Sequence, residues 1–356
     1  MSQSLPWRQA SPLSGAIRWR RREFLRRATL AGTAGMLGLR PGRGCSESSP
    51  ETTRIRLSQI PSLCIAPQYV AEELLRGEGF TDVQYIKTET GRSPMDDLGP
   101  YQALAFGKVD FNAGMVGELV ARIDAGDPIV ILTGTHAGCF ELFGTDRVRS
   151  VKDLKGKTVA VPGLGTSHHF FVASIAAYVG LDPSKDINFI TPSLADAVQL
   201  FVEGKIDAIF DFPPVPQELR AKKIGHVVVD GRVDRPWSQY FCCMLAAHSE
   251  FVRKYPAATK RAVRAIMKAN DVCTLEPERV ARLLVDKGYT RHYDYAVQAL
   301  KELPYSKWRE YDPEDTVRFY ALRLREAGMI KASPQKIIAQ GTDWRFLNEL
   351  KNELKG

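Results

Sequence analysis

A glycine-rich turn followed by Thr and Ser is the segment of this chain whose residue types best suit the binding of a small molecule. The apolar run 159–162 leads into a turn with Gly163 and Gly165, and Thr166-Ser167 then open an apolar helix. A strand that ends on such a turn at a helix start presents backbone N–H groups to an anionic or polar ligand. Ser and Thr also cap helices, because their oxygens accept bonds from those N–H groups. The segment therefore predicts a ligand site, in which Thr166 and Ser167 are either ligand contacts or caps alone.

Strand and helix patterns alternate along most of the chain, and this alternation indicates how such a site is held. Strands are expected at 55–60, 83–88, 109–113 and 129–133, with intervening helices at 66–76, 101–106 and 117–125. Residues 151–229 repeat the same β-α-β-α-β order. Later helices are expected at 251–255, 257–275, 278–287, 293–303, 313–327 and 334–338. The pattern predicts an α/β protein with two doubly wound lobes.

The chain is expected to cross between the lobes near 146–150 and to return near 231–238. We therefore predict one lobe from residues 54–147 plus 239–356 and a second from residues 148–238, preceded by a signal peptide at 1–45 and a linker at 46–53. Two crossings make a hinge, and a hinged cleft between lobes is a common ligand site.

The cleft residues are expected at the ends of strands and at the starts of the helices that follow them. From the first lobe these are Gln59, Leu63, Cys64, Met115, Val116, His136, Gly138 and Cys139. The second lobe supplies Thr166, Ser167, His168 and Asp211, and Tyr240 arrives at the return crossing. These predicted loops contain no Lys or Arg. An organic acid, a zwitterion or an aromatic heterocycle therefore fits the residue set better than a bare inorganic anion.

Two of these side chains have specific expected roles. His168 lies in the first turn of its helix, where a protonated imidazole would oppose the helix dipole, so a neutral ring is expected. Asp211 would contact a ligand amine or hydroxyl, or would cap the segment before Pro213-Pro214.

Four motifs carry a family resemblance: D-L-K-G-K-T-V-A-V-P-G-L-G-T-S at 153–167, A-P-Q-Y-V-A at 66–71, A-L-A-F-G-K-V-D-F at 103–111 and F-V-R-K-Y-P at 251–256. The sequence resembles the solute-binding proteins of ABC importers, in the nitrate, sulfonate and taurine group that also contains thiamine-precursor binders. The resemblance implies the type II periplasmic binding fold. It also implies a monomer without catalysis, cofactor, bound metal or nucleic-acid partner. Such a protein would capture a carboxylate, sulfonate or pyrimidine-like ligand between its lobes and deliver it to a membrane permease.

An enzyme on the same fold is the alternative. The fungal pyrimidine synthases of thiamine biosynthesis resemble this chain in the same places, and they need a Lys for pyridoxal phosphate and a sacrificial His. Gly114 and Glu118 stand at those two positions. Since glycine cannot form a Schiff base and glutamate has no imidazole, the resemblance disfavours that chemistry here. A secreted two-lobe sensor or chaperone-like factor is a further alternative.

An export signal is expected at the N-terminus. Residues 20–26, R-R-R-E-F-L-R, resemble a twin-arginine motif and are followed by the apolar run Ala28–Leu39. That run is too short for a membrane span, which needs about 20 apolar residues, and it suits a signal peptide. Gly44-Cys45 resembles a lipoprotein cleavage point at which Cys45 would be acylated. We therefore expect a periplasmic or other extracytoplasmic location.

The net charge of +8 also comes from this segment. Residues 1–45 hold nine Arg and a single acidic residue, and the remainder has as many acidic as basic residues. The basic pI of the whole chain is therefore no sign of nucleic-acid binding.

Three interpretations of Cys64 and Cys139 remain open. Cys64 and Cys139 are expected to converge beside the cleft as small buried hydrophobes, as a disulfide, or as soft-metal ligands near His136. The spacings match no structural zinc motif. Cys242-Cys243 stands where the fungal synthases carry a Cys-rich run.

Overall fold

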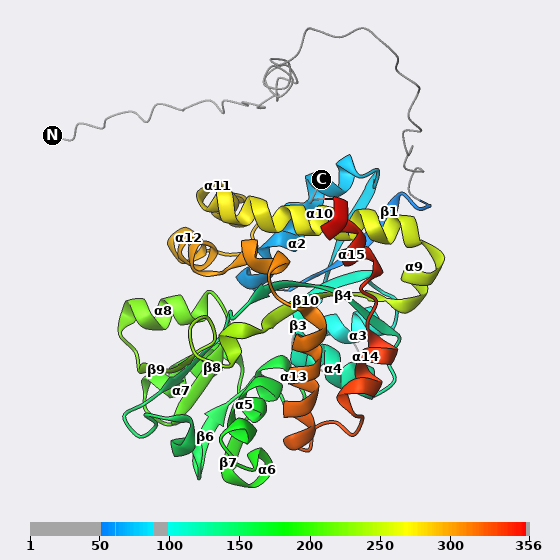
Figure 1. Ribbon diagram of the computed structural model, residues 1–356. Coiled ribbons are helices and arrows are strands. Elements are labelled where there is room, and N and C mark those ends of the chain that lie inside the picture. Colours follow the sequence, from blue (N-terminus) through cyan, green and yellow to red (C-terminus); the bar gives the residue numbers. More distant parts are fainter. Residues whose placement is uncertain (1–50, 61, 89–98, 354–356) are drawn as a thin grey trace, which may run out of the picture. The chain divides into compact units, whose positions relative to one another are not determined.

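The computed structural model describes residues 51–60, 62–88 and 99–353, all of which lie in one unit of the chain (Figure 1). The expected signal peptide with its twin-arginine-like motif, and Cys45, lie outside these residues. Two five-stranded sheets organise the unit, each with helices packed beside it. The first sheet has the order β2 (Asp82–Lys87), β1 (Arg54–Gln59), β3 (Phe111–Met115), β10 (Phe241–His248) and β4 (Ile129–Ala137). The second has the order β7 (Ile187–Ile190), β6 (Lys157–Ala160), β8 (Ala208–Asp211), β5 (Glu141–Gly144) and β9 (His226–Asp230).

Both sheets are mixed. β1 pairs in parallel with β2 and β3, and β6 pairs in parallel with β7 and β8, as the alternating pattern predicts. β10 runs antiparallel to β3 and β4, and β5 runs antiparallel to β8 and β9. β5 is the first strand after the chain passes to the second sheet, and β10 is the first strand after it returns to the first sheet. The predicted α/β class with two lobes is confirmed.

The helices divide between the sheets. Those beside the first sheet are α2 (Ala66–Gly77), α3 (Pro100–Ala105), α4 (Val116–Asp124), α9 (Ser249–Lys254), α10 (Pro256–Leu275), α11 (Pro277–Asp286), α12 (Tyr293–Glu302), α13 (Pro313–Glu326), α14 (Pro334–Gly341) and α15 (Arg345–Glu353). Those beside the second are α5 (Ser167–Tyr178), α6 (Pro183–Asp186), α7 (Leu194–Val202) and α8 (Val215–Lys222). Short 3-10 turns complete the described elements: η1 (Leu63–Ile65), η2 (Val151–Leu154), η3 (Trp237–Gln239) and η4 (Tyr305–Arg309). Of the described helices, none combines the length and apolar character that a membrane span requires.

The crossings differ in part from the expectation. β5 already belongs to the second sheet, so the chain has left the first sheet by Glu141, earlier than the expected 146–150. The chain returns to the first sheet between the end of β9 at Asp230 and the start of β10 at Phe241. The expected range, 231–238, lies within this segment. We call residues 141–230 the second lobe, 138–140 and 231–240 the crossing segments, and the other described residues the first lobe.

The two crossing segments touch each other. The Gly231 N–H donates to the Phe140 carbonyl at 2.9 Å. Gly138 has a positive φ of 35°, and a Cβ placed on it would lie 2.0 Å from the Gly231 carbonyl oxygen. Glycine is required here because no side chain fits between the two backbones.

Aromatic side chains join the lobes. Phe171 of α5 lies edge-on to Tyr320 of α13, with 5.4 Å between ring centroids, and it also packs on Phe140 of the crossing segment. Trp237 in the return crossing contacts Phe319 of α13 in the same edge-on way. Full burial of one such side chain stabilises by about 2 kcal/mol, so the lobes are held together largely by apolar surface.

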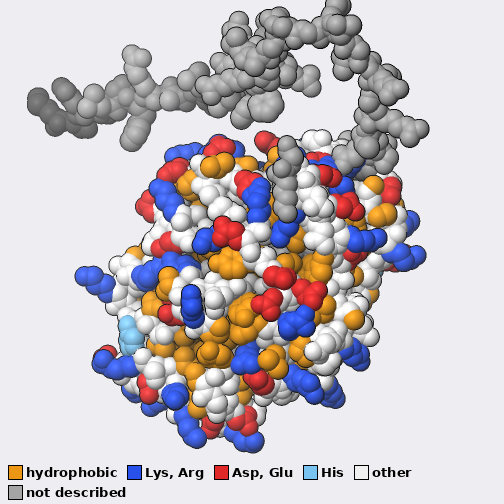
Figure 2. Space-filling model, in the orientation of Figure 1, with side chains coloured by type: hydrophobic (Ala, Val, Ile, Leu, Met, Phe, Trp, Pro, Cys, Tyr) orange, Lys and Arg blue, Asp and Glu red, His pale blue; other side chains and the backbone are white. Residues whose placement is uncertain are grey.

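Charged side chains of both signs intermingle on the surface. On the face that Figure 2 shows, blue and red side chains alternate, and no part of it is covered by a single sign of charge. This distribution matches the equal number of acidic and basic residues after position 45.

Candidate functional site

Ser167 makes a buried polar contact between the lobes. It is the first residue of α5, and its hydroxyl donates to Glu118 Oε2 of α4 at 2.6 Å. The Ser167 oxygen also lies 3.2 Å from the hydroxyl of Tyr101 on α3. All three side chains are buried, so this contact shields polar groups of both lobes from solvent.

The glycine-rich turn explains why Ser167 is free to reach the first lobe. Gly165 has a φ of 77°, and Thr166 occupies the N-cap position without a side-chain cap bond. Its hydroxyl instead donates to the Gly163 carbonyl at 2.6 Å and closes the turn. Neither Thr166 nor Ser167 caps α5 with its side chain, so the capping alternative is wrong for both residues.

Burial changes the protonation of this contact. Loss of solvent raises the pKa of Glu118 to about 7, although the Ser167 hydrogen bond and the Arg122 charge oppose the rise. Burial and the neighbouring Glu118 also raise the pKa of Tyr101. Glu118 can therefore be either a neutral carboxyl or a carboxylate near neutral pH.

Further polar groups of the first lobe lie beside this contact. Asn112 of β3 accepts a hydrogen bond from Ser58, and its buried Nδ2 has no partner among the described residues. A Cβ on Gly114 would meet that Nδ2 and the Tyr101 hydroxyl, both at 2.7 Å. A side chain at position 114 would therefore require Asn112 and Tyr101 to shift.

His168 lies one residue further along α5 and faces the end of β8. Its Nε2 is 3.4 Å from Asp211 Oδ1, and its ring lies edge-on to Phe212. Asp211 is buried, and its Oδ2 has no partner among the described residues. A buried carboxylate oxygen without a partner is costly, which favours a ligand donor at this point.

The neighbouring His169 points elsewhere. Its Nδ1 accepts a hydrogen bond from the Gly165 N–H at 3.0 Å, and its ring packs against Phe189 of β7. Burial lowers its pKa. It therefore stabilises the turn within the second lobe.

An ionic cluster forms a second polar contact across the lobes. Glu302 at the end of α12 pairs with Arg220 of α8 and with Arg232 of the return crossing. Both arginines also pair with Glu141 of β5. Burial raises the pKa of Glu141, and the two arginines oppose that rise. Sequence reasoning missed this cluster because its four members are far apart in the chain and no local pattern links them.

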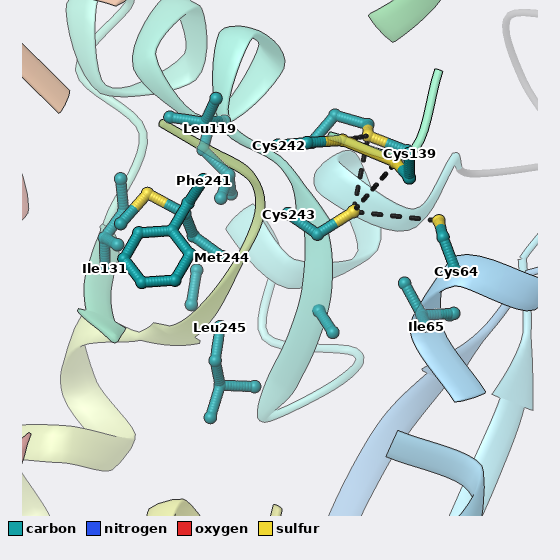
Figure 3. Close-up of a cluster of buried hydrophobic side chains, with 14 of the residues drawn as sticks. Cys64, Ile65, Leu119, Ile131, Cys139, Phe241, Cys242, Cys243, Met244 and Leu245 are labelled. Carbon is teal, nitrogen blue, oxygen red and sulfur yellow. Dashed lines mark hydrogen bonds between the residues drawn. A yellow bond between two sulfur atoms is a disulfide. The ribbon is translucent and has the colours of Figure 1, made fainter. Parts of the chain in front are cut away.

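Sulfur atoms gather in the first lobe (Figure 3). Cys139 forms a disulfide with Cys242, so the alternative of a Cys64–Cys139 disulfide is wrong. Cys64 Sγ lies 3.7 Å from Cys243 Sγ, and Cys243 Sγ lies 3.4 Å from Met115 Sδ. Cys242 and Cys243 are adjacent in β10, and adjacent strand residues normally point to opposite faces of a sheet. The pairing of β10 with β4 shifts register at these residues, and both cysteines lie near the crossing.

Other expected cleft residues have separate partners. The Gln59 carbonyl accepts bonds from Thr88, and Tyr240 stacks on Phe319 at 4.0 Å between centroids. The Leu63 N–H donates to the Pro213 carbonyl of the second lobe at 3.2 Å. Val116 is a buried apolar residue at the start of α4. His136 lies inside β4 rather than in a loop after it.

Comparison with known proteins defines the class. A nitrate-binding periplasmic protein from Synechocystis PCC 6803 superposes with a TM-score of 0.69 at 17% identity, over 86% of this chain and 90% of the other. The fold is that of the periplasmic binding proteins, as expected from the resemblance. The chain belongs to the NMT1-like family, whose model matches residues 48–285.

Two curated relatives indicate the range of activities in related proteins. The taurine-binding periplasmic protein of Escherichia coli is 24% identical over 60% of this chain and 66% of its own length. A 4-amino-5-hydroxymethyl-2-methylpyrimidine phosphate synthase of Saccharomyces cerevisiae is 22% identical over 58% of this chain and 62% of its own. The chain thus spans less than two thirds of the length of each. Binding proteins and an enzyme both occur among its relatives.

Proposed function

We propose that this protein is the solute-binding component of an ABC importer and captures a small organic ligand between its lobes. The observation that carries the proposal is the contact of Ser167 with Glu118 and Tyr101, which buries polar groups of both lobes against each other. Opening at the crossings would expose these groups to a ligand, and closure would enclose it. The closed form would then be delivered to a membrane permease.

The polar groups around this contact favour a ligand that carries both donors and acceptors. Glu118 and Asp211 offer acceptor oxygens, and Asn112 Nδ2 and His168 offer nitrogen. A zwitterion such as an amino sulfonate or amino acid, or a heterocycle with ring nitrogens, satisfies both kinds of group. The taurine-binding relative supports the first of these classes.

Absence of catalysis is part of the proposal. Gly114 stands at the position of the lysine on which the pyrimidine synthases depend, and a side chain there would have to displace Asn112 and Tyr101. Glu118, at the position where those enzymes carry the histidine, is engaged by Ser167.

Native mass spectrometry of the protein purified from its own cell envelope tests the binding role. A retained small molecule identifies the ligand class directly. If the protein is empty, a thermal-shift screen of carboxylates, sulfonates and pyrimidines follows. A protein that neither retains nor is stabilised by any of them contradicts the proposal.

Adjacent histidines provide a matched pair of variants for the site. His168→Ala should weaken affinity for the identified ligand about tenfold, because one hydrogen bond to a charged ligand group is worth about 1.5 kcal/mol. His169→Ala, whose ring packs inside the second lobe, should bind as the wild type does. Equal affinities of the two variants, measured by calorimetry, would exclude His168 from the site.

We also propose export by the twin-arginine route through residues 20–26, with Cys45 as a candidate lipid anchor. The change of Arg21 and Arg22 to Lys should retain the protein in the cytoplasm. Normal export of that variant, assayed by cell fractionation, would favour another route.

A further inference from the structure

A group of potential metal ligands lies where η1, β4, β10 and a crossing segment meet. Cys64 of η1, His136 of β4, Cys139 of the crossing segment and Cys243 of β10 place their ligand atoms within 4.8 Å of one another. All four are buried. Figure 3 shows the sulfur atoms of Cys64, Cys139 and Cys243 pointing toward one another from separate elements.

One of the four is already engaged, because Cys139 is joined to Cys242. The other three, Cys64, His136 and Cys243, remain free to act as ligands. Two thiols and one imidazole are a donor set that thiophilic ions prefer. Met115 adds a thioether, with its Sδ 3.4 Å from Cys243 Sγ.

The spacing of the two thiols fits a shared ion. Two thiolates bound at about 2.3 Å to one tetrahedral ion lie about 3.8 Å apart. Cys64 Sγ and Cys243 Sγ are 3.7 Å apart. No rearrangement of the backbone is needed to bring them to one ion.

The imidazole provides an independent observation. His136 Nδ1 lies 3.2 Å from the Ala137 carbonyl, which accepts its hydrogen. Nε2 then carries the lone pair, and it is buried without a partner among the described residues. This arrangement, with one ring nitrogen donating to a carbonyl and the other free, is typical of metal-binding histidines. Leaving this buried nitrogen unsatisfied is unfavourable, and a bound ion would satisfy it.

Another cysteine of the same lobe shows what an isolated buried thiol looks like. Cys273 of α10 is fully buried and free, and burial raises its pKa. Cys64 is buried to the same degree, but its Sγ lies 3.1 Å from Ser62 Oγ and 3.7 Å from Cys243 Sγ. The cluster therefore differs from a simple apolar filler in its chemical surroundings.

We infer that Cys64, Cys243 and His136 hold one thiophilic d10 ion, Zn²⁺ or Cu⁺, with Met115 as an additional soft donor. The ion is a resident of the first lobe and not the transported ligand, since its ligands come from η1, β4 and β10 and are buried there. The inference does not depend on the proposed importer function.

Metal loading of the full chain tests the inference. The protein, with its disulfide intact, is incubated without oxygen with Zn²⁺ or with Cu⁺, passed over a desalting column and analysed by elemental mass spectrometry. The wild type should retain about one equivalent of at least one of the two ions. Retention of less than about a tenth of an equivalent of both ions would overturn the inference.

Three serine variants locate the bound ion. Cys64→Ser and Cys243→Ser should each weaken retention about tenfold or more, whereas the matched control Cys273→Ser should behave as the wild type does. Circular dichroism checks that each variant is folded. Equal retention by all three variants would place the ion elsewhere and overturn the assignment.

A measurement on the wild type avoids the risk that a variant fails to fold. Co²⁺ bound by two thiolates should give an intense thiolate-to-cobalt absorption in the near ultraviolet, and added Zn²⁺ should abolish it. A cobalt-loaded chain without this absorption, or peptide mapping that finds Cys64 and Cys243 joined to each other, would contradict the inference.

Discussion

Buried polar groups occur in two regions of this molecule, and the two regions differ in which lobes supply their members. The cluster of Cys64, His136 and Cys243 comes from elements of the first lobe alone. The pair of Ser167 and Glu118 is covered because the two lobes meet. Opening at the crossings would leave the first region intact and expose the second. The cluster therefore belongs to the internal structure of one lobe, whereas the environment of the Ser167–Glu118 pair depends on whether the lobes are closed.

The largest expected effect comes from the two crossing segments, through which the lobes are connected. Gly138→Ala should lower the free energy of unfolding by about 3–4 kcal/mol, because the new methyl group meets the Gly231 carbonyl and the backbone must move. The measurement is chemical denaturation in urea.

Gly165→Ala is the matched control for that change. Gly165 also has a positive φ, but nothing lies within 4 Å of the added Cβ, so only about 1 kcal/mol should be lost. Equal losses for the two variants would show that the contact between the crossing segments has no energetic role.

A smaller effect is expected from the protonation of Glu118. Its pKa is about 7 in the folded protein against 4.5 for an unperturbed group, so the folded state holds the proton more tightly. The resulting stabilisation is complete below about pH 4.5 and is lost as the pH rises through 7. Glu118→Gln removes this dependence, and its stability relative to the wild type should rise by about 2 kcal/mol between pH 5 and pH 8.

Thermal unfolding at several pH values measures this difference. Glu203→Gln, which alters an exposed carboxylate paired with Lys205, should show no such rise. A difference between Glu118→Gln and wild type that stays constant with pH would mean that Glu118 is not shielded from solvent by closure.

The smallest effect is expected from the hydroxyl that joins the lobes. Ser167→Ala should cost about 1 kcal/mol at pH 6, because one hydrogen bond between lobes is lost. Ser174→Ala is the control, since Ser174 is buried on the same helix and donates only to the Phe170 carbonyl of that helix. X-ray scattering should detect a larger radius for Ser167→Ala and not for Ser174→Ala. If the radius is unchanged in both variants, the Ser167 hydrogen bond does not hold the lobes closed.

Most of the fold could be predicted from periodicity. The helix expected at 257–275 is α10, Pro256–Leu275, and the helix expected at 66–76 is α2, Ala66–Gly77. Strand β10 was not predicted, because its sequence F-C-C-M-L-A-A-H has neither polar alternation nor β-branched residues. It is a strand because it is buried between β3 and β4. The short strand β5 was also not predicted, because it is a strand only through its pairing with β8 and β9.

The candidate site could be predicted only in part. Ser167, His168 and Asp211 follow from strand ends and helix starts, which are local features. Glu118 and Tyr101 were not expected to meet Ser167, because that contact depends on how far the lobes close. No residue pattern along the chain records that distance.

The disulfide between Cys139 and Cys242 has a consequence for the covalent connectivity of the chain. Its two residues are 103 positions apart, their Cα atoms are 6.3 Å apart, and the whole second lobe lies between them. The second lobe is therefore a closed covalent ring attached to the first at one point. A protease that cuts once within this ring releases no fragment, because both new ends remain tethered. One or two residues can span the 6.3 Å gap, so these two positions are where a chain without the second lobe would be joined.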